Sequence, residues 1–89
     1  VIFQAGEVRL QADANIRLDE IANLIKERFK KEVVIYVYTE IERLSSERSR
    51  VIEVEIKKRV VLPKDALKVA PRFIPGLQPK NSRIEVHIL

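Results

Sequence analysis

Apolar residues early in the chain recur with the spacing of a helix. In residues 16–31 they form one stripe, which consists of Leu18, Ile21, Ala22, Ile25 and Phe29. Asn15 can cap the start of this segment, and Lys30 and Lys31 place positive charge at its end, as the helix dipole favours. Because a helix of this length is marginal by itself, the pattern predicts an amphipathic helix that lies on a sheet.

Two later segments alternate between apolar and polar residues, with the period of a strand. Residues 33–42 place on one face Val33, Ile35, Val37 and Ile41, and on the other face Val34, Tyr36, Tyr38, Glu40 and Glu42. Residues 51–62 place inward Ile52, Val54, Ile56, Val60 and Leu62. We expect the two strands to pair in antiparallel, joined by a loose loop over residues 42–50 that has room for a helical turn.

The two ends of the chain carry weaker signals. The opening residues 1–12 alternate with a slip in phase, and Gly6 is the natural place for a bulge or a break. A short helix is expected from Lys64 to just before Pro71, and Pro75-Gly76 suits the centre of a type II turn. Residues 83–89 read as a final strand, with the inward row Ile84, Val86 and Ile88.

Together these segments predict an α+β fold in a single small domain over residues 1–89. The expected order is strand, helix, strand, strand, a short helix or irregular segment, and strand, with one amphipathic helix packed on a largely antiparallel sheet. The chain has no Met, so Val1 is no translation start, and we expect a trimmed chain or a piece of a longer one. With neither a signal peptide nor an apolar run of about 18 residues, a cytoplasmic protein is expected.

Composition adds two points. The chain has no cysteine, which excludes disulfides and thiolate metal sites. Lys, Arg, Glu, Ile and Val are plentiful while Met and Trp are missing, which is typical of a thermophile's protein.

The positive charge is concentrated in the last third of the chain. Residues 1–58 contain eleven basic and eleven acidic residues, whereas residues 59–89 contain six and two. Such a concentration favours binding to DNA or RNA, although a net charge of +4 is also ordinary for solubility. The candidate nucleic-acid-binding residues are Lys57, Arg59, Lys64, Lys68, Arg72, Lys80 and Arg83.

Two tyrosines extend this candidate site. Tyr36 and Tyr38 face outward on the predicted hairpin, where they would lie beside Lys57 and Arg59 of the next strand. Aromatic residues among basic ones on a sheet face can stack single-stranded bases. The alternative is that these tyrosines serve only strand packing, for which the residue is favoured.

Catalytic chemistry is not indicated. His87 is the only histidine, on the outward row of the last strand, and the serines have no base nearby in sequence. With two glycines in the chain there is no glycine-rich phosphate loop. We therefore expect no enzyme, no cofactor, no metal site and no small-molecule substrate.

The segments EVRLQADANIRLDEIANLIKERF (7–29) and EVVIYVYTEIERLSSERSRVIEVEIKK (32–58) resemble, as a pattern, the later half of Alba-type proteins of archaeal chromatin and RNA. The resemblance implies a dimer associated with nucleic acid. The chain departs from the family in three ways. It lacks the family's first strand and helix, and it has Gln11 to Ala14 where the family has a basic link. Residues 59–89 have no counterpart in the family. No binding residue carries over.

The sequence thus favours a non-catalytic nucleic-acid-binding module that uses residues 59–83 and acts as a homodimer. The alternative is an assembly or adaptor module that pairs through exposed strand edges, with no nucleic-acid role.

Overall fold

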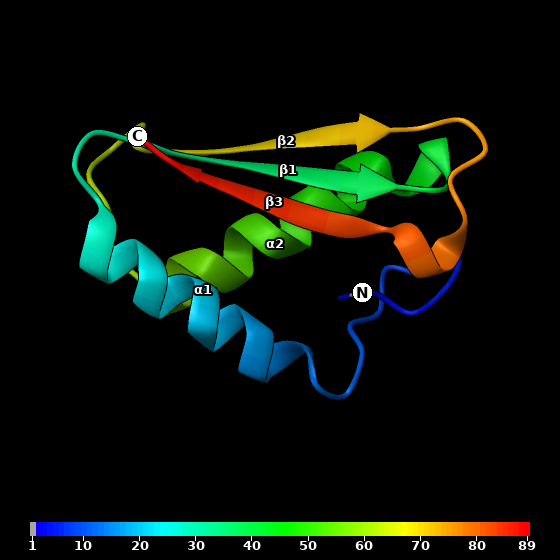
Figure 1. Cartoon of the computed structure of the whole chain (residues 1–89), viewed down its shortest axis with the longest axis horizontal. Coiled ribbons are helices and arrows are strands. Elements are labelled where there is room, and N and C mark those ends of the chain that lie inside the picture. Colours follow the sequence, from blue (N-terminus) through cyan, green and yellow to red (C-terminus); the bar gives the residue numbers. More distant parts are fainter. Residues whose placement is uncertain (1) are drawn as a thin grey trace.

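The computed structural model describes residues 2–89 of the chain and contains two helices on one side of a mixed sheet. The elements in order are α1 (Ala14–Arg28), β1 (Val33–Thr39), the short 3₁₀ helix η1 (Glu42–Leu44), α2 (Ser45–Arg59), β2 (Leu67–Phe73), the 3₁₀ helix η2 (Pro79–Asn81) and β3 (Arg83–Ile88). The strands lie in the order β2-β1-β3, with β1 parallel to β2 and antiparallel to β3. Figure 1 shows α1 and α2 on the same face of the sheet.

The α+β class is confirmed, and so are three of its predicted elements. Helix α1 buries Leu18, Ala22 and Ile25 of the predicted stripe. Strand β1 alternates as expected between buried and half-buried residues, although it ends at Thr39. Strand β3 covers Arg83–Ile88. The expected cap at Asn15 is wrong, because α1 begins one residue earlier and Asp13, at the N-cap position, makes no side-chain cap hydrogen bond.

The predicted strand over residues 51–62 is wrong, because most of this segment belongs to helix α2. Ile52 and Ile56 are buried at helical spacing, whereas Val54, which a strand would have turned inward, is 46% exposed. The buried stripe of α2 begins with polar residues, since Ser45, Arg48 and Ser49 occupy its first turns. The hairpin is therefore absent, and α2 instead connects two parallel strands.

The short helix predicted before Pro71 is also wrong, because strand β2 lies there. Proline is tolerated in β2 because this strand is at an edge of the sheet. The Val33 N–H donates to the Ala66 oxygen at 2.8 Å, and the Ile74 N–H donates to the Thr39 oxygen at 3.3 Å. In a parallel ladder this phase leaves the even-numbered residues of β2 bonded to β1, so the missing N–H of Pro71 falls on the outer edge.

Both glycines have positive φ, Gly76 in the predicted turn and Gly6 where a bulge or a break is expected. Gly76 has φ of +80°, and the Leu77 N–H donates to the Ile74 oxygen at 3.1 Å, as the predicted type II turn requires. Gly6 has φ of +69° and lies between Phe3 and Leu10, which form a single antiparallel bridge. Over the described residues the predicted opening strand is replaced by this turn and its single bridge. Val1 of that prediction lies outside the described residues.

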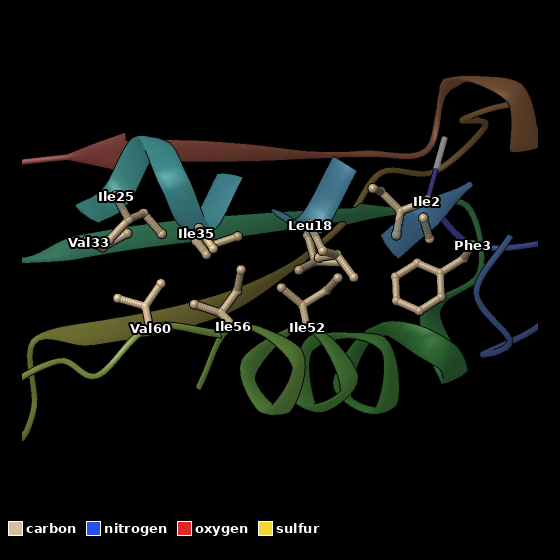
Figure 2. Packing of buried hydrophobic residues seen from close by; sticks show 12 residues of the cluster. Ile2, Phe3, Leu18, Ile25, Val33, Ile35, Ile52, Ile56 and Val60 are labelled. Atoms are coloured by element: carbon tan, nitrogen blue, oxygen red, sulfur yellow. The ribbon is translucent and has the colours of Figure 1, made fainter. Parts of the chain in front are cut away.

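The core fills the space between the two helices and the sheet. Leu18 and Ile25 of α1, Val33 and Ile35 of β1, and Ile52 and Ile56 of α2 are all fully buried. Figure 2 shows these side chains meeting along β1, with Ile2 and Phe3 closing one end. Burial of such side chains contributes about 1.5–3 kcal/mol each. Both helices therefore depend for their stability on contacts with β1.

Arg48 is the largest fully buried side chain and ties α2 to the N-terminal segment. It is 1% exposed, and its Nη2 lies 2.8 Å from the Glu40 carboxylate, which is also buried. The guanidinium donates from Nε to the backbone carbonyl oxygen of Glu7 at 2.9 Å and from Nη2 to that of Gln4 at 3.2 Å. It also lies 5.0 Å from the centre of the Phe3 ring. One side chain thereby fixes the path of the chain before α1.

Within residues 2–89 neither helix combines the length and apolar character needed to cross a membrane.

Replacing Arg48 by Met should lower the free energy of unfolding by about 3–5 kcal/mol, because it leaves the buried Glu40 carboxylate without its cation. Urea denaturation followed by circular dichroism measures this change. Arg50→Met, on the exposed side of the same helix, is the matched control and should change the value by less than about 0.5 kcal/mol.

If Arg48→Met does not fold, adding Glu40→Leu should restore folding, because the unpaired charge is then gone. Equal stabilities of Arg48→Met and the wild type would contradict the role given to this ion pair.

Candidate functional site

The face of the sheet that points away from the helices gathers residues from all three strands. The strand registers place Lys68, Ala70 and Arg72 of β2 and Arg83, Glu85 and His87 of β3 beside the outward row of β1. We call this surface the open face, and it consists of Val34, Tyr36, Tyr38, Lys68, Ala70, Arg72, Arg83, Glu85 and His87. No helix or strand of the described residues covers it (Figure 1).

Each tyrosine of the open face is flanked by an arginine from a different neighbouring strand. The Arg72 guanidinium carbon lies 4.6 Å from the centre of the Tyr36 ring. On the other side, the Arg83 guanidinium carbon lies 4.3 Å from the centre of the Tyr38 ring. Both distances are those of cation–π contacts. His87 adds a third contact, with its ring edge-on to Tyr36 at a centroid distance of 5.3 Å.

The open face is cationic, with one acidic residue at its centre. Arg72, Arg83 and Lys68 are exposed. Glu85 lies 3.8 Å from an Arg83 nitrogen and 3.1 Å from His87 Nε2. Lys68 reaches Glu32 beyond the start of β1 at 3.5 Å. Exposed pairs of this kind hold their partners weakly, so the cations remain free to turn toward an anionic ligand.

The structure brings together five of the predicted site residues and separates the rest. Tyr36, Tyr38, Lys68, Arg72 and Arg83 share the open face. Lys57 and Arg59 do not lie beside the tyrosines, because the segment that carries them is helix α2 on the other side of the sheet. The expected pairing of these two residues with Tyr36 and Tyr38 is therefore wrong.

Arg59 instead joins the two helices. Its Nε donates to Asp19 at 2.8 Å, its Nη2 to the Asn15 side-chain oxygen at 3.0 Å, and its Nη1 to the Glu55 carboxylate at 2.8 Å. The hydrogen bond from Arg59 is the main cause that lowers the pKa of Glu55, and Glu55 in turn raises the pKa of Arg59. Arg59 is thus a structural residue between α1 and α2.

Lys64 and Lys80 are exposed at opposite ends of the sheet. Lys64 lies in the loop before β2, which starts beside Val33, whereas Lys80 lies in η2 before β3, which starts beside Tyr38. Each lysine shortly precedes, in the sequence, a strand that contributes to the open face, but neither makes any of the contacts described on that face.

Sequence reasoning missed the parts of His87 and Glu85. The alternation of β3 does show that Arg83, Glu85 and His87 share one row. What the pattern lacked was the position of β3 directly beside β1, which places this row against the tyrosines.

The described residues contain no cluster of metal-ligating side chains. Across residues 2–89 no three His, Cys, Asp or Glu side chains lie close enough to hold a metal ion. A groove away from the open face lies between the end of α2 and the loop before β2, where Val61 is 98% exposed.

Comparison with known proteins gives a fold relative only. The chain matches no family model and no curated protein sequence. Among solved structures it is similar to the OmpA-like domain of FopA1 from Francisella tularensis subsp. tularensis SCHU S4, with a TM-score of 0.74 and 18% sequence identity. The likeness covers 94% of this chain but spans only 66% of that chain. At this identity it supports the α+β fold and nothing about activity.

Glu55→Gln should lower the free energy of unfolding at pH 7 and lose this effect in acid. The lowered pKa of Glu55 in the folded state means that its contribution is complete above the unfolded value of about 4.3 and disappears as the pH falls through the folded value. Urea denaturation between neutral and acidic pH measures the difference from the wild type.

The control for this experiment is the same change in an Arg59→Met background, where the main cause of the shift is gone. There the effect of Glu55→Gln should depend much less on pH. An unchanged pH dependence in that background would show that Arg59 does not stabilise the Glu55 carboxylate.

Proposed function

We propose that the protein is a non-catalytic nucleic-acid-binding module that holds single-stranded DNA or RNA on the open face. The observation that carries the proposal is the pair of stacks, Arg72 on Tyr36 and Arg83 on Tyr38, on a sheet face that no element of residues 2–89 covers. Single-strand binding needs flat π-surfaces together with cations that follow the backbone. The open face offers both, with the tyrosines on the central strand β1 and one arginine on each neighbouring strand.

The stacked arginines define how a base would bind. A base can displace the guanidinium from the tyrosine ring, after which the arginine is free to contact a phosphate. Alternatively, the base can stack on the outer side of the guanidinium plane, as bases do in single-stranded RNA complexes. Either way, each tyrosine and its arginine form one site for one base, and the two sites lie next to each other along β1.

The geometry favours single strands over duplexes. In a duplex the bases already stack on one another, so tyrosines on a flat sheet have no access to the ring faces. Lys64 and Lys80, beyond the two ends of the face, would act at longer range by attracting the phosphate backbone. The module therefore needs only Lys68, Arg72 and Arg83 for direct phosphate contacts.

The sequence assigns nucleic-acid binding to the basic segment of residues 59–83. This proposal limits direct contacts to the residues of that segment that lie on the open face. It keeps the nucleic-acid role that the resemblance to Alba-type proteins implies, on a different surface. The hairpin of residues 32–58 that this resemblance contains is not formed, since residues 45–59 are helical. A cytoplasmic location remains part of the proposal.

A second candidate function is assembly through a strand edge, without a role in nucleic-acid binding. The observation that favours it is the outer edge of β3, which no strand of the described residues pairs with. Unpaired edges of this kind recruit strands from other chains unless charge, proline or a covering element blocks them.

Tyr36→Leu should weaken binding of a single-stranded oligonucleotide by about 5- to 150-fold, which corresponds to the loss of one stacked base. Fluorescence anisotropy with labelled mixed-sequence probes at low salt measures the affinity. Tyr36→Phe keeps the ring and is the matched control, so it should bind nearly as well as the wild type. Equal affinities of the Leu and Phe variants would rule out stacking.

Reversing the charge of Arg72 and Arg83 together should abolish measurable binding while circular dichroism still shows a folded protein, because both residues are exposed. The loss of their cation–π contacts should lower the melting temperature by only a few degrees. The matched control reverses Arg50 and Lys57, two exposed residues of α2, and should retain most of the affinity. If the two double variants lose binding to the same extent, net charge and not the open face is responsible.

The logarithm of the binding constant should fall with the logarithm of the salt concentration with a slope of about −2, as expected for three phosphate contacts to a single strand. Titrations at several salt concentrations on single- and double-stranded probes measure this slope. The proposal fails if no probe binds at about 50 mM salt and protein concentrations of tens of micromolar.

A further inference from the structure

Strand β3 directs part of its backbone away from the sheet. Beyond the end of β3, Leu89 and Glu32 exchange both backbone hydrogen bonds, at 2.8 and 3.3 Å. Bonded pairs alternate along an antiparallel ladder, so the odd-numbered residues of β3 also bond to β1. The N–H and C=O groups of Ile84, Val86 and Ile88 therefore point to the outer edge, where the described residues supply no strand.

The two edges of the sheet differ in how they are protected. On β2 the outward backbone position at residue 71 is a proline, which has no N–H to offer, and prolines on an edge prevent pairing. Strand β3 contains no proline, and its helix-side row is entirely aliphatic. Of the two edges, β3 is the one suited to receive another strand.

We propose that β3 pairs in antiparallel with β3 of a second copy of this chain, about a two-fold axis at Val86. In this register Val86 faces the partner's Val86, and Ile84 faces the partner's Ile88 on the helix side of the sheet. On the open face, Glu85 comes opposite the partner's His87. The sequence RIEVHI is thus complementary to itself, with every acidic residue of the strand facing an imidazole.

Other registers that keep the backbone bonds are less favourable. Even-numbered residues must face even-numbered residues, and odd-numbered residues odd-numbered ones, because only the even-numbered residues carry the free backbone groups. Moving the axis to Glu85 places two carboxylates opposite each other, and moving it to His87 pairs two imidazoles and shortens the overlap. Like charges directly opposite are destabilising, so the register centred on Val86 combines a long overlap with a carboxylate opposite an imidazole, which can form a hydrogen bond.

Hollows at both ends of the β3 edge fit the same arrangement. One, beside Val86 and Ile88, is also lined by Leu24 and by Leu89, which is 57% exposed. The other lies beside Ile84, with Ile2 and Ile21 in its wall. The two-fold axis brings the partner's Ile84 toward the first hollow and the partner's Ile88 toward the second. Charged side chains also line both hollows, Glu27, Arg28 and Lys30 in the first and Arg17, Glu20 and Arg83 in the second, so each copy covers only the apolar part of them.

The result is a continuous six-stranded sheet with all four helices on one side. A two-fold axis perpendicular to the sheet keeps the two open faces on the same side, so they join into one surface. The inference rests on the second candidate function, strand-edge assembly, and it does not depend on nucleic-acid binding, since it is tested without nucleic acid.

Sedimentation equilibrium of the wild-type chain should show a dimer whose dissociation constant rises at least about tenfold in Val86→Pro, because the two backbone bonds at the axis are lost. Val86 uses its outward N–H only at the interface, so the bonds to β1 are retained in this variant. A wild-type monomer at millimolar concentration overturns both the edge assembly and the register. A dimer that Val86→Pro leaves unchanged assembles elsewhere and overturns the β3 interface alone.

Charge exchange tests the register with exposed side chains that do not endanger folding. His87→Glu places carboxylates opposite Glu85 in both copies, and Glu85→Lys places Lys opposite His87. The His87→Glu change should weaken the dimer by roughly 2- to 30-fold, since it alters two symmetric cross-strand pairs. The double variant, Glu85→Lys with His87→Glu, places opposite charges across the interface and should recover wild-type affinity or better.

The same substitutions decide the case if Val86→Pro does not fold. Circular dichroism confirms that the exchange variants are folded. Recovery in the double variant supports the register centred on Val86, whereas a double variant as weak as His87→Glu overturns it.

Discussion

The buried guanidinium of Arg48 is the constraint on which the rest of the arrangement depends. A charge removed from water must be matched by a counter-charge and by hydrogen-bond acceptors. Arg48 finds these in Glu40, just after β1, and in two carbonyl oxygens of the N-terminal segment. They come together only if α2 turns back under the sheet immediately after β1. These long-range contacts hold in place the helix that a reading by alternation takes for a strand.

The position of α2 then decides the topology of the sheet. A helix that returns along the sheet delivers the chain to the same end from which β1 started, so β2 runs parallel to β1. Strand β3 takes the remaining side of β1 in antiparallel. Because α1 and α2 both lie on one face of the sheet (Figure 1) and bury their apolar residues there, no helix of residues 2–89 covers the other face. Its residues come from three strands that are distant in the sequence.

Both surfaces that we connect with function follow from this one-sided architecture. The open face carries stacked arginines because β1, with its tyrosines, is the central strand and each neighbour contributes one cation. The edge of β3 is accessible because three strands leave two outer edges, of which only β2 is protected by a proline. Strand β3 belongs to both surfaces: Arg83 and His87 lie on the face, while Val86 lies at the edge.

The sequence by itself determined the features that depend on neighbouring residues. The period of α1, the alternation of β1 and β3, and the turn at Gly76 are local properties, so they were predictable. The outward position of Tyr36 and Tyr38, and the basic character of the segment with Arg72 and Arg83, were predictable for the same reason.

Only the tertiary structure decided what these residues contact. Helix α2 was not predicted, because its buried stripe begins with polar residues and continues with β-branched ones. A buried Arg48 is recognisable only once its partners are in place. Strand β2 was not predicted, because it contains Pro71. The strand tolerates this proline only because it lies at an edge of the sheet. Lys57 and Arg59 were therefore assigned to the tyrosines in place of Arg72 and Arg83. Strand order is set by long-range packing, and no local pattern contains it.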